Sequence, residues 1–256
     1  VPSDEVVAAI HREKPNVVLA PHVETSAGMI LPNDYLKALG DAVHSCGGLF
    51  VLDCIASGAI WVDMKACNVD VIISAPQKGW SGSPCAAMVM LSERAMQKLD
   101  ETQSSSFSCD LKKWQQIMQA YENGGHAYHA TMPTDALTVF RNVMKETEQL
   151  GFEKVREYQQ ELGDKVRAML VGNGVKSVAA EGFQSPGVVV CYANTPEIKS
   201  GKAFAAAGMQ IAGGVPLMCD EGDDFQSFRL GLFGLDKLLN IDRTVASLTS
   251  VIEKIF

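Results

Sequence analysis

The sequence has no long apolar run, no Cys-x-x-Cys motif and no excess of positive charge. No stretch approaches the roughly 20 apolar residues that a membrane helix needs, so we expect no membrane partner. Acidic residues outnumber basic ones by 30 to 22, and this balance argues against a nucleic-acid partner. The seven cysteines are odd in number and widely spaced, which favours reduced thiols and a cytoplasmic protein.

The residues that are present describe an ordinary globular enzyme, with 47% apolar and 20% charged residues in a chain of 256. Short apolar runs predict buried strands over residues 17–20, 49–52, 69–73 and 86–91. Helical patterns over residues 4–14 and 33–45 precede the first and the second of these runs. This alternation predicts an α/β fold whose mainly parallel sheet is sandwiched by helices.

The second half of the chain begins with two long amphipathic helical patterns, and Gly151 lies between them. Beyond this glycine we expect strands over 175–178, 187–192 and 228–232, a helix over 197–207 and a terminal helix. The pattern therefore predicts a large domain over residues 1–150 and a smaller α+β domain over residues 151–256.

Three polar side chains follow three of the predicted strands: Thr25, Asp53 and Lys78. The carboxyl ends of parallel strands share one edge of a sheet, and ligands bind at that edge. We therefore expect the three residues to converge there. Taken singly, Lys78 is also consistent with a solvated surface lysine, and Asp53 with a cap of the turn after its strand.

A lysine and a carboxylate at neighbouring strand ends are the pair that a pyridoxal 5′-phosphate (PLP) site requires. The lysine forms a Schiff base with the cofactor, and the carboxylate pairs with the pyridinium nitrogen. Further along the chain, strand alternation places Phe228, Leu230 and Leu232 on one face and Arg229 on the other. A guanidinium in that position suits a carboxylate ligand, although a structural arginine paired with a local acid is the alternative.

Five segments together resemble the class V aminotransferases, which are PLP enzymes of fold type I, and most closely the alanine–glyoxylate and serine–pyruvate branch. The similarity extends over essentially the whole chain. The segments are His22-Val-Glu-Thr-Ser-Ala-Gly28, Leu52-Asp-Cys-Ile-Ala-Ser57, Ser74-Ala-Pro-Gln-Lys78, Tyr128-His-Ala-Thr-Met-Pro133 and Phe228-Arg-Leu-Gly-Leu-Phe-Gly234.

The resemblance implies a role for each residue around the cofactor ring. Lys78 would carry the cofactor, Asp53 would pair with the ring nitrogen, and both would be catalytic. Ile55 would pack on the ring face, and Thr25 would contact the ring oxygen or the substrate.

The resemblance also implies the ligands of the cofactor phosphate and of the substrate. Gln77 would reach the phosphate, and Tyr128 and Thr131 would reach the phosphate of a neighbouring subunit. The active form would then be a homodimer with shared sites. Arg229 would bind the carboxylate of a small amino acid or of a 2-oxo acid such as glyoxylate or pyruvate.

We expect no metal site, because His22, His126 and His129 do not have the spacing of metal ligands. Structural histidines with hydrogen-bond partners are the better interpretation. Cys54 beside Asp53 is interpreted as a buried thiol, not as a nucleophile.

Three other functions remain open. A 2-aminoethylphosphonate transaminase shares the fold, as does a cysteine desulfurase-type lyase. Lyases of that type usually carry histidine where this chain has Gln77, and Cys219 is their only candidate loop cysteine. The third alternative is a non-catalytic remnant, because the resemblance implies that the Gly-rich phosphate loop and the ring-stacking residue precede Val1, leaving the N-terminal part of the family fold outside this chain.

Overall fold

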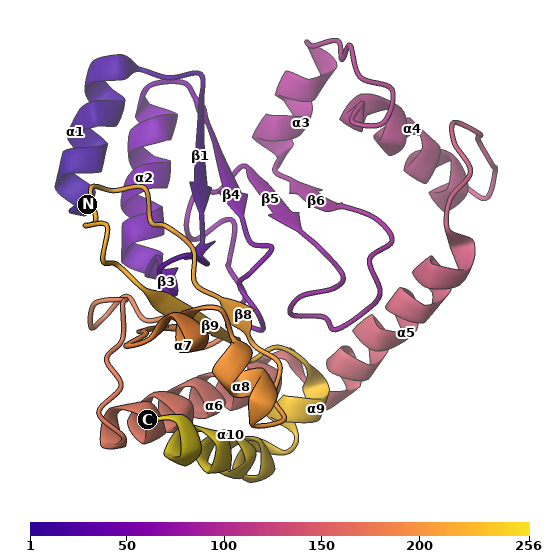
Figure 1. Cartoon of the computed structure of the whole chain (residues 1–256). Coiled ribbons are helices and arrows are strands. Elements are labelled where there is room, and N and C mark those ends of the chain that lie inside the picture. The colour runs from indigo at the N-terminus through magenta and orange to yellow at the C-terminus, as the bar shows by residue number, and fades with distance from the viewer.

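A four-stranded sheet lies at the centre of the computed structural model, which describes residues 1–256 (Figure 1). Its strand order is β1-β4-β5-β6. The first three strands are mutually parallel, and β6 is antiparallel to β5. The expected mainly parallel sheet is therefore confirmed. The strands of this sheet are β1 (Val17–Pro21), β4 (Leu49–Asp53), β5 (Val71–Ser74) and β6 (Met88–Leu91).

Helices α1 (Ser3–Glu13) and α2 (Asn33–Ser45) pack side by side next to β1 and β4 (Figure 1). Leu36, Leu39 and Val43 form a stripe at helical spacing, and all three are buried. They share one hydrophobic core with Phe50 and Leu52, the inward residues of β4. A short hairpin of β2 (Val23–Glu24) and β3 (Met29–Ile30) follows β1.

A helical arm extends from the far edge of the sheet. It comprises α3 (Glu93–Asp100) and α4 (Leu111–Glu122), and α5 (Thr134–Leu150) returns the chain toward the body of the molecule (Figure 1). Gly151 separates α5 from α6 (Phe152–Gly172) with a φ of +89°. Glycine adopts this left-handed region readily, and the chain changes direction here.

The C-terminal part has its own core, in which α6 and α10 (Ile241–Ile255) pack against a three-stranded sheet of order β7-β9-β8. The division at Gly151 stays a prediction, in keeping with the separate cores. The remaining elements are β7 (Val188–Tyr192), α7 (Pro196–Lys199), α8 (Lys202–Ala206), β8 (Ala212–Gly213), β9 (Ser227–Gly231) and α9 (Leu235–Leu238).

Two expectations for this part are wrong. Residues 175–178 form no strand, because only Ser177 makes a single bridge, to Cys191. The expected helix over 197–207 is two short helices, since Gly201 between them has a φ of +78° and interrupts the helical hydrogen bonds. None of the helices combines the length and apolarity that a bilayer crossing requires.

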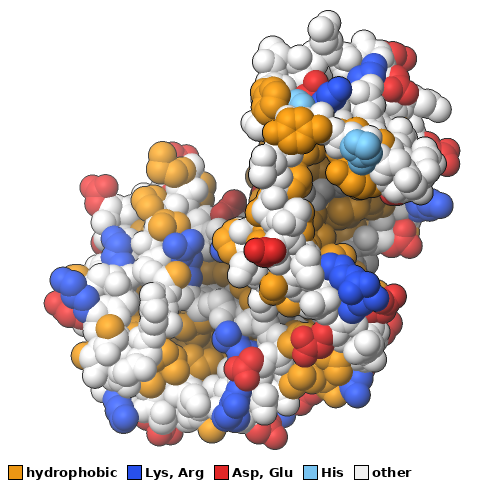
Figure 2. All heavy atoms as spheres, turned by 90° about the vertical axis from the view of Figure 1, so that its right-hand side faces the viewer, with side chains coloured by type: hydrophobic (Ala, Val, Ile, Leu, Met, Phe, Trp, Pro, Cys, Tyr) orange, Lys and Arg blue, Asp and Glu red, His pale blue; other side chains and the backbone are white.

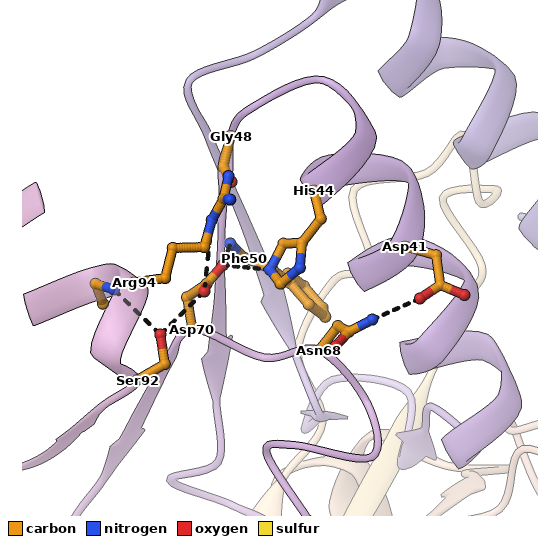
Figure 3. A network of polar contacts seen from close by, with 9 residues as sticks. Asp41, His44, Gly48, Phe50, Asn68, Asp70, Ser92 and Arg94 are labelled. Atoms are coloured by element: carbon orange, nitrogen blue, oxygen red, sulfur yellow. Dashed lines mark hydrogen bonds and ion pairs between the residues drawn. The ribbon is translucent and has the colours of Figure 1, made fainter. Parts of the chain in front are cut away.

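The amino-terminal edge of the parallel strands is held by Asp70, which is 1% exposed (Figure 3). Its carboxylate accepts hydrogen bonds from Phe50 N at 2.9 Å and Ser92 Oγ at 3.0 Å. His44 Nε2 lies 2.8 Å and Arg94 Nε 3.9 Å from the same carboxylate. One buried acid therefore joins α2, β4 and α3, so its neighbours compensate the cost of burying a charge.

Candidate active site

The carboxyl ends of β1, β4 and β5 lie on one edge of the sheet. In the register of the strands, Pro21 pairs with Asp53, and Asp53 pairs with Ile73. The ladder continues past the strand ends, because His22 N donates to Asp53 O and Cys54 N donates to Ile73 O, each at 2.8 Å. The parallel arrangement on which the convergence of the candidate residues depends is therefore confirmed.

Asp53 ends β4 and begins a tight turn. Its Oδ1 accepts a hydrogen bond from Ile55 N at 2.9 Å, as expected of an aspartate that caps the turn after its strand. The side chain is half-buried, and its second oxygen makes no hydrogen bond within the chain. The carboxylate can therefore cap the turn and still accept a hydrogen bond from a ligand.

Lys78 lies in the turn that follows β5. The turn is closed by hydrogen bonds from Ser81 N to Lys78 O at 3.0 Å and from Gly82 N to Pro76 O at 2.9 Å. Lys78 is half-buried and forms no ion pair with any acid. Its amine is therefore not committed to a structural contact.

The turns after Asp53 and after Lys78 touch each other. Gly79 packs on the backbone of Gly58, and a Cβ at position 79 would collide with the Gly58 carbonyl. Both turns also line one mainly apolar cavity of about 130 Å³, together with Trp61, Met88 and Met90. The two segments that carry the candidate catalytic residues are thus neighbours in space as well as along the sheet edge.

Thr25 is half-buried at the tip of the β2–β3 hairpin. The tip is held by Glu24, whose carboxylate accepts hydrogen bonds from Ser26 N at 2.9 Å and Ser26 Oγ at 2.8 Å. Gly28, with a φ of +70°, packs so tightly on β7 that a Cβ would lie 2.8 Å from Val190 Cγ2. The hairpin that carries Thr25 is therefore packed against the C-terminal part.

A buried pair, which the sequence did not indicate, supports the same edge. His22 is 2% exposed, and its Nδ1 lies 2.7 Å from Ser57 Oγ in the turn after Asp53. Burial lowers the pKa of His22 to about 4, so the imidazole is neutral at pH 7. Burial likewise raises the pKa of Cys54 to about 12, in agreement with a buried thiol.

Arg229 belongs to β9 in the C-terminal part. Phe228, Leu230 and Leu232 are 0–3% exposed whereas Arg229 is half-buried, so the expected alternation of faces is confirmed. Its Nε donates to Gly213 O at 2.8 Å, and it pairs with no acid. The terminal guanidinium nitrogens make no hydrogen bond within the chain, and the role as a carboxylate ligand stays a prediction.

The other candidate residues are distributed unevenly. Ile55 is half-buried beside the Asp53 turn and lines the apolar cavity, whereas Gln77 is exposed. Tyr128 is 79% exposed and Thr131 is also exposed, both in the segment between α4 and α5. This segment lies on the arm, away from the sheet edge (Figure 1). Within one chain, therefore, Tyr128 and Thr131 are not brought to Asp53 and Lys78.

Comparison with protein families gives a match over most of the chain. The family model described as aminotransferase class-V matches residues 3–194. That range contains every candidate site residue except Arg229.

Curated relatives are similar over long stretches but are themselves longer. The small subunit of a soluble hydrogenase from Synechococcus sp. is 26% identical over 250 residues, which are 96% of this chain and 61% of the relative. Alanine–glyoxylate aminotransferase 1 of Saccharomyces cerevisiae is 26% identical over 228 residues, 84% of this chain and 57% of the relative. The 2-aminoethylphosphonate–pyruvate transaminase of Salmonella schwarzengrund is 29% identical over 196 residues, covering 75% and 51%. The chain therefore spans about three fifths or less of these relatives.

Solved structures share the fold. An alanine–glyoxylate aminotransferase from Nostoc sp. superposes with a TM-score of 0.83 at 20% identity, covering 98% of this chain and 66% of that chain. The ureidoglycine–glyoxylate aminotransferase of Bacillus subtilis gives a TM-score of 0.79 at 22% identity, covering 100% and 65%. At these identities the likeness establishes the architecture alone.

Proposed function

Because this chain belongs to the class V aminotransferases, PLP-dependent transaminases of fold type I, we propose that it transfers an amino group from a small L-amino acid to a 2-oxo acid. Alanine or serine is the proposed donor, and glyoxylate or pyruvate the proposed acceptor. The observation that carries the proposal is the contact between the turn after Asp53 and the turn after Lys78, at the edge where parallel strands end.

The residues at this edge fit the cofactor. Asp53 has one carboxylate oxygen free of hydrogen bonds, and Lys78 has an amine free of ion pairs. Ile55 offers an apolar surface beside Asp53. Two adjoining turns thus supply an acceptor for a ring nitrogen, an amine for an aldehyde carbon and an apolar contact for a ring.

Each residue then has a chemical task. PLP, when bound, supplies an electron sink for the negative charge that develops at the substrate α-carbon. Asp53 would hold a proton on the ring nitrogen by charge pairing, which would favour that electron withdrawal. Lys78 would hold the cofactor covalently, and its amine would serve as general base for the substrate α-proton.

Arg229 is the proposed ligand of the substrate carboxylate. Its Nε is fixed on Gly213 O, which leaves the two terminal nitrogens for a bidentate contact. A guanidinium fork orients the substrate more strictly than a lysine would, because two parallel hydrogen bonds define a plane.

We include a homodimer in the proposal, because Tyr128 and Thr131 are exposed on the arm and far from the sheet edge of their own chain. The arm carries exposed hydrophobic side chains, which Figure 2 shows gathered on the protruding lobe beside histidines. Such a patch is typical of an interaction surface. Its exposed hydrophobic residues are Phe107, Met118, Tyr121, Tyr128, Met132 and Val139. Sedimentation of the chain should give a mass twice that of one subunit.

We also propose a cytoplasmic localisation, which the cysteines led us to expect and which cell fractionation tests.

A second candidate is a 2-aminoethylphosphonate transaminase, favoured by the 29% identical Salmonella relative. The two candidates differ in the donor, since a phosphonate carries an extra negative charge in place of the carboxylate. Assays with alanine, serine and 2-aminoethylphosphonate in parallel separate them. Release of sulfide from cysteine would instead favour the lyase alternative.

Covalent trapping tests the proposal directly. The chain is incubated with PLP, reduced with borohydride and digested, and the peptide that contains Lys78 should carry a pyridoxyl group. Lys98, an exposed lysine paired with Glu101, is the internal reference and should stay unmodified. PLP bound elsewhere, or no PLP uptake by the folded chain, would reject the proposed function and favour a non-catalytic remnant.

A further inference from the structure

Four aromatic rings form a cluster beside the turn that carries Lys78. The Trp80 ring centroid lies 5.2 Å from that of Trp61, 6.1 Å from that of Phe140 and 6.4 Å from that of Phe152. Trp61 and Phe152 are 5.6 Å apart. Three of the four pairs meet edge to face, with interplanar angles of 81–87°, an arrangement that aromatic rings prefer.

The cluster joins segments that are far apart in the sequence. Trp61 follows the Asp53 turn, Phe140 belongs to α5, and Phe152 is the first residue of α6 after Gly151. Trp61 Nε1 also donates to Phe152 O at 3.0 Å, which fixes one indole to the corner between the two helices. Trp80 therefore links the Lys78 turn to the point where the chain passes into its C-terminal part.

Few other side chains hold this turn. Gln77 points into solvent, and Gly79 contributes only backbone contact with Gly58. Ser81 has a φ of +56°, a region that non-glycine residues rarely adopt, and its Oγ packs against Gly234. The indole of Trp80 is thus the large anchor of a turn whose backbone is otherwise held by two hydrogen bonds.

We propose that Trp80 is a positioning residue, which holds the Lys78 turn through its packing against Trp61, Phe140 and Phe152. The inference rests on the proposed function, because it assigns Lys78 the reacting amine. Removing the indole frees the turn to move relative to the α5–α6 corner, and Lys78 Nζ then loses its fixed position at the sheet edge. The ring is needed for its shape and its edge-to-face contacts, so phenylalanine should replace tryptophan better than leucine does.

The test measures the reactivity of the Lys78 amine in the chain without PLP. Lysines are reductively methylated with formaldehyde and cyanoborohydride, and the methylation rate of each is followed by peptide mapping. In Trp80→Leu we expect the rate at Lys78 to change by about threefold or more, since small displacements of an oriented group change rates strongly. In Trp80→Phe it should stay within about twofold of the parent, and Lys98 should be unaffected in both.

The control is Tyr35→Ala, which removes an aromatic ring of another edge-to-face pair, with Phe183 at 6.4 Å, on α2. It should leave the Lys78 rate unchanged, and circular dichroism should show that all three variants are folded. Because the readout needs no cofactor, it separates this proposal from the proposed function. An unchanged Lys78 rate in Trp80→Leu, or an equal change in Trp80→Phe, would overturn it even if PLP traps Lys78 as expected.

In the PLP-loaded protein, a positioning role predicts different effects on kcat and on KM. Trp80→Leu should lower kcat more than it raises KM, since the substrate carboxylate is held elsewhere, by Arg229. A rise in KM with kcat unchanged would contradict positioning of the amine and would assign Trp80 to substrate binding.

Discussion

The two edges of the central sheet treat an aspartate in opposite ways. At the amino-terminal edge, Asp70 is buried, and its carboxylate is surrounded by Phe50 N, Ser92 Oγ, His44 and Arg94 (Figure 3). At the carboxyl-terminal edge, Asp53 is half-buried and uses one oxygen for a turn, with no ion pair. The carboxylate of Asp70 is used entirely in contacts within the protein, whereas Asp53 keeps one carboxylate oxygen available for a ligand.

Aspartate thus serves two purposes in one sheet. A buried carboxylate whose partners all come from the protein stabilises the fold and has no capacity left for a ligand. A partly exposed carboxylate with a free oxygen contributes less to stability but can pair with a substrate or cofactor. Mutations at the two edges should therefore separate stability from activity.

The largest effect is expected from Lys78→Ala. In the proposed function Lys78 supplies both the covalent link to the cofactor and the general base, so without its amine transamination from alanine to glyoxylate should fall by about ten-thousandfold. Thermal unfolding should be nearly unchanged, because the side chain makes no ion pair. The control Lys98→Ala should keep parental activity, and an active Lys78→Ala would contradict the assignment of the edge.

Asp53→Asn should follow, with activity reduced by about a thousandfold through loss of charge opposite the ring nitrogen. Asparagine keeps an oxygen for Ile55 N, so the turn and the melting temperature should be preserved. Asp63 is a matched control, since its Oδ1 accepts from Lys65 N at 2.9 Å in a similar turn. Asp63→Asn should leave activity unchanged, and a comparable loss there would show that the turn matters more than the charge.

Asp70→Ala, at the amino-terminal edge, should lower stability and leave activity nearly unchanged. Removing one member of a buried ionic network costs about 3–4 kcal/mol of stability, because the remaining polar groups lose their partner. Urea unfolding measures this loss, whereas kcat of the remaining folded protein should change little. Asp41→Ala removes an acid from an exposed pair with Lys37 and should cost less than about 1 kcal/mol.

The smallest effect is a pH dependence due to His22. Its pKa is lowered from 6.5 to about 4 by burial, so below pH 6.5 the unfolded chain binds a proton that the folded chain does not. The contribution of neutral His22 to the free energy of unfolding is fully present above pH 6.5 and is lost as the pH falls toward about 4. Its complete loss lowers the free energy of unfolding by about 3 kcal/mol. His22→Gln should remove this component from urea unfolding measured between pH 7 and 4, whereas His11→Gln at an exposed site should not.

The sequence predicted the elements whose signals are local. Apolar runs at β1, β4 and β5 and amphipathic stripes at α2, α5 and α6 need no knowledge of the rest of the chain. The common edge of the parallel strands followed from the rules of sheet topology. The break at Gly201 was not predicted, because the sequence does not reveal the φ of a lone glycine inside a helical pattern. The predicted strand over 175–178 does not form, because this segment makes only one bridge, from Ser177 to Cys191.

The long-range contacts could not be predicted in this way. The pairing of His22 with Ser57 spans 35 positions, and the ring cluster joins Trp61, Trp80, Phe140 and Phe152 across four separate segments. The packing of Gly79 on Gly58 leaves no trace in composition or periodicity. The roles of all the candidate site residues stay predictions. Those of Lys78, Asp53 and Arg229 were argued from the residues themselves, whereas those of Ile55, Gln77, Tyr128 and Thr131 came from the family resemblance alone.

The contact of Gly79 with Gly58 has a consequence for measurements on the site. Two backbone segments that touch without side chains contain nothing that can be titrated, oxidised or screened by salt. The contact between the two turns therefore has no titratable group of its own. Above the pH range in which the buried His22 takes up a proton, we expect changes of rate with pH to report the reacting groups.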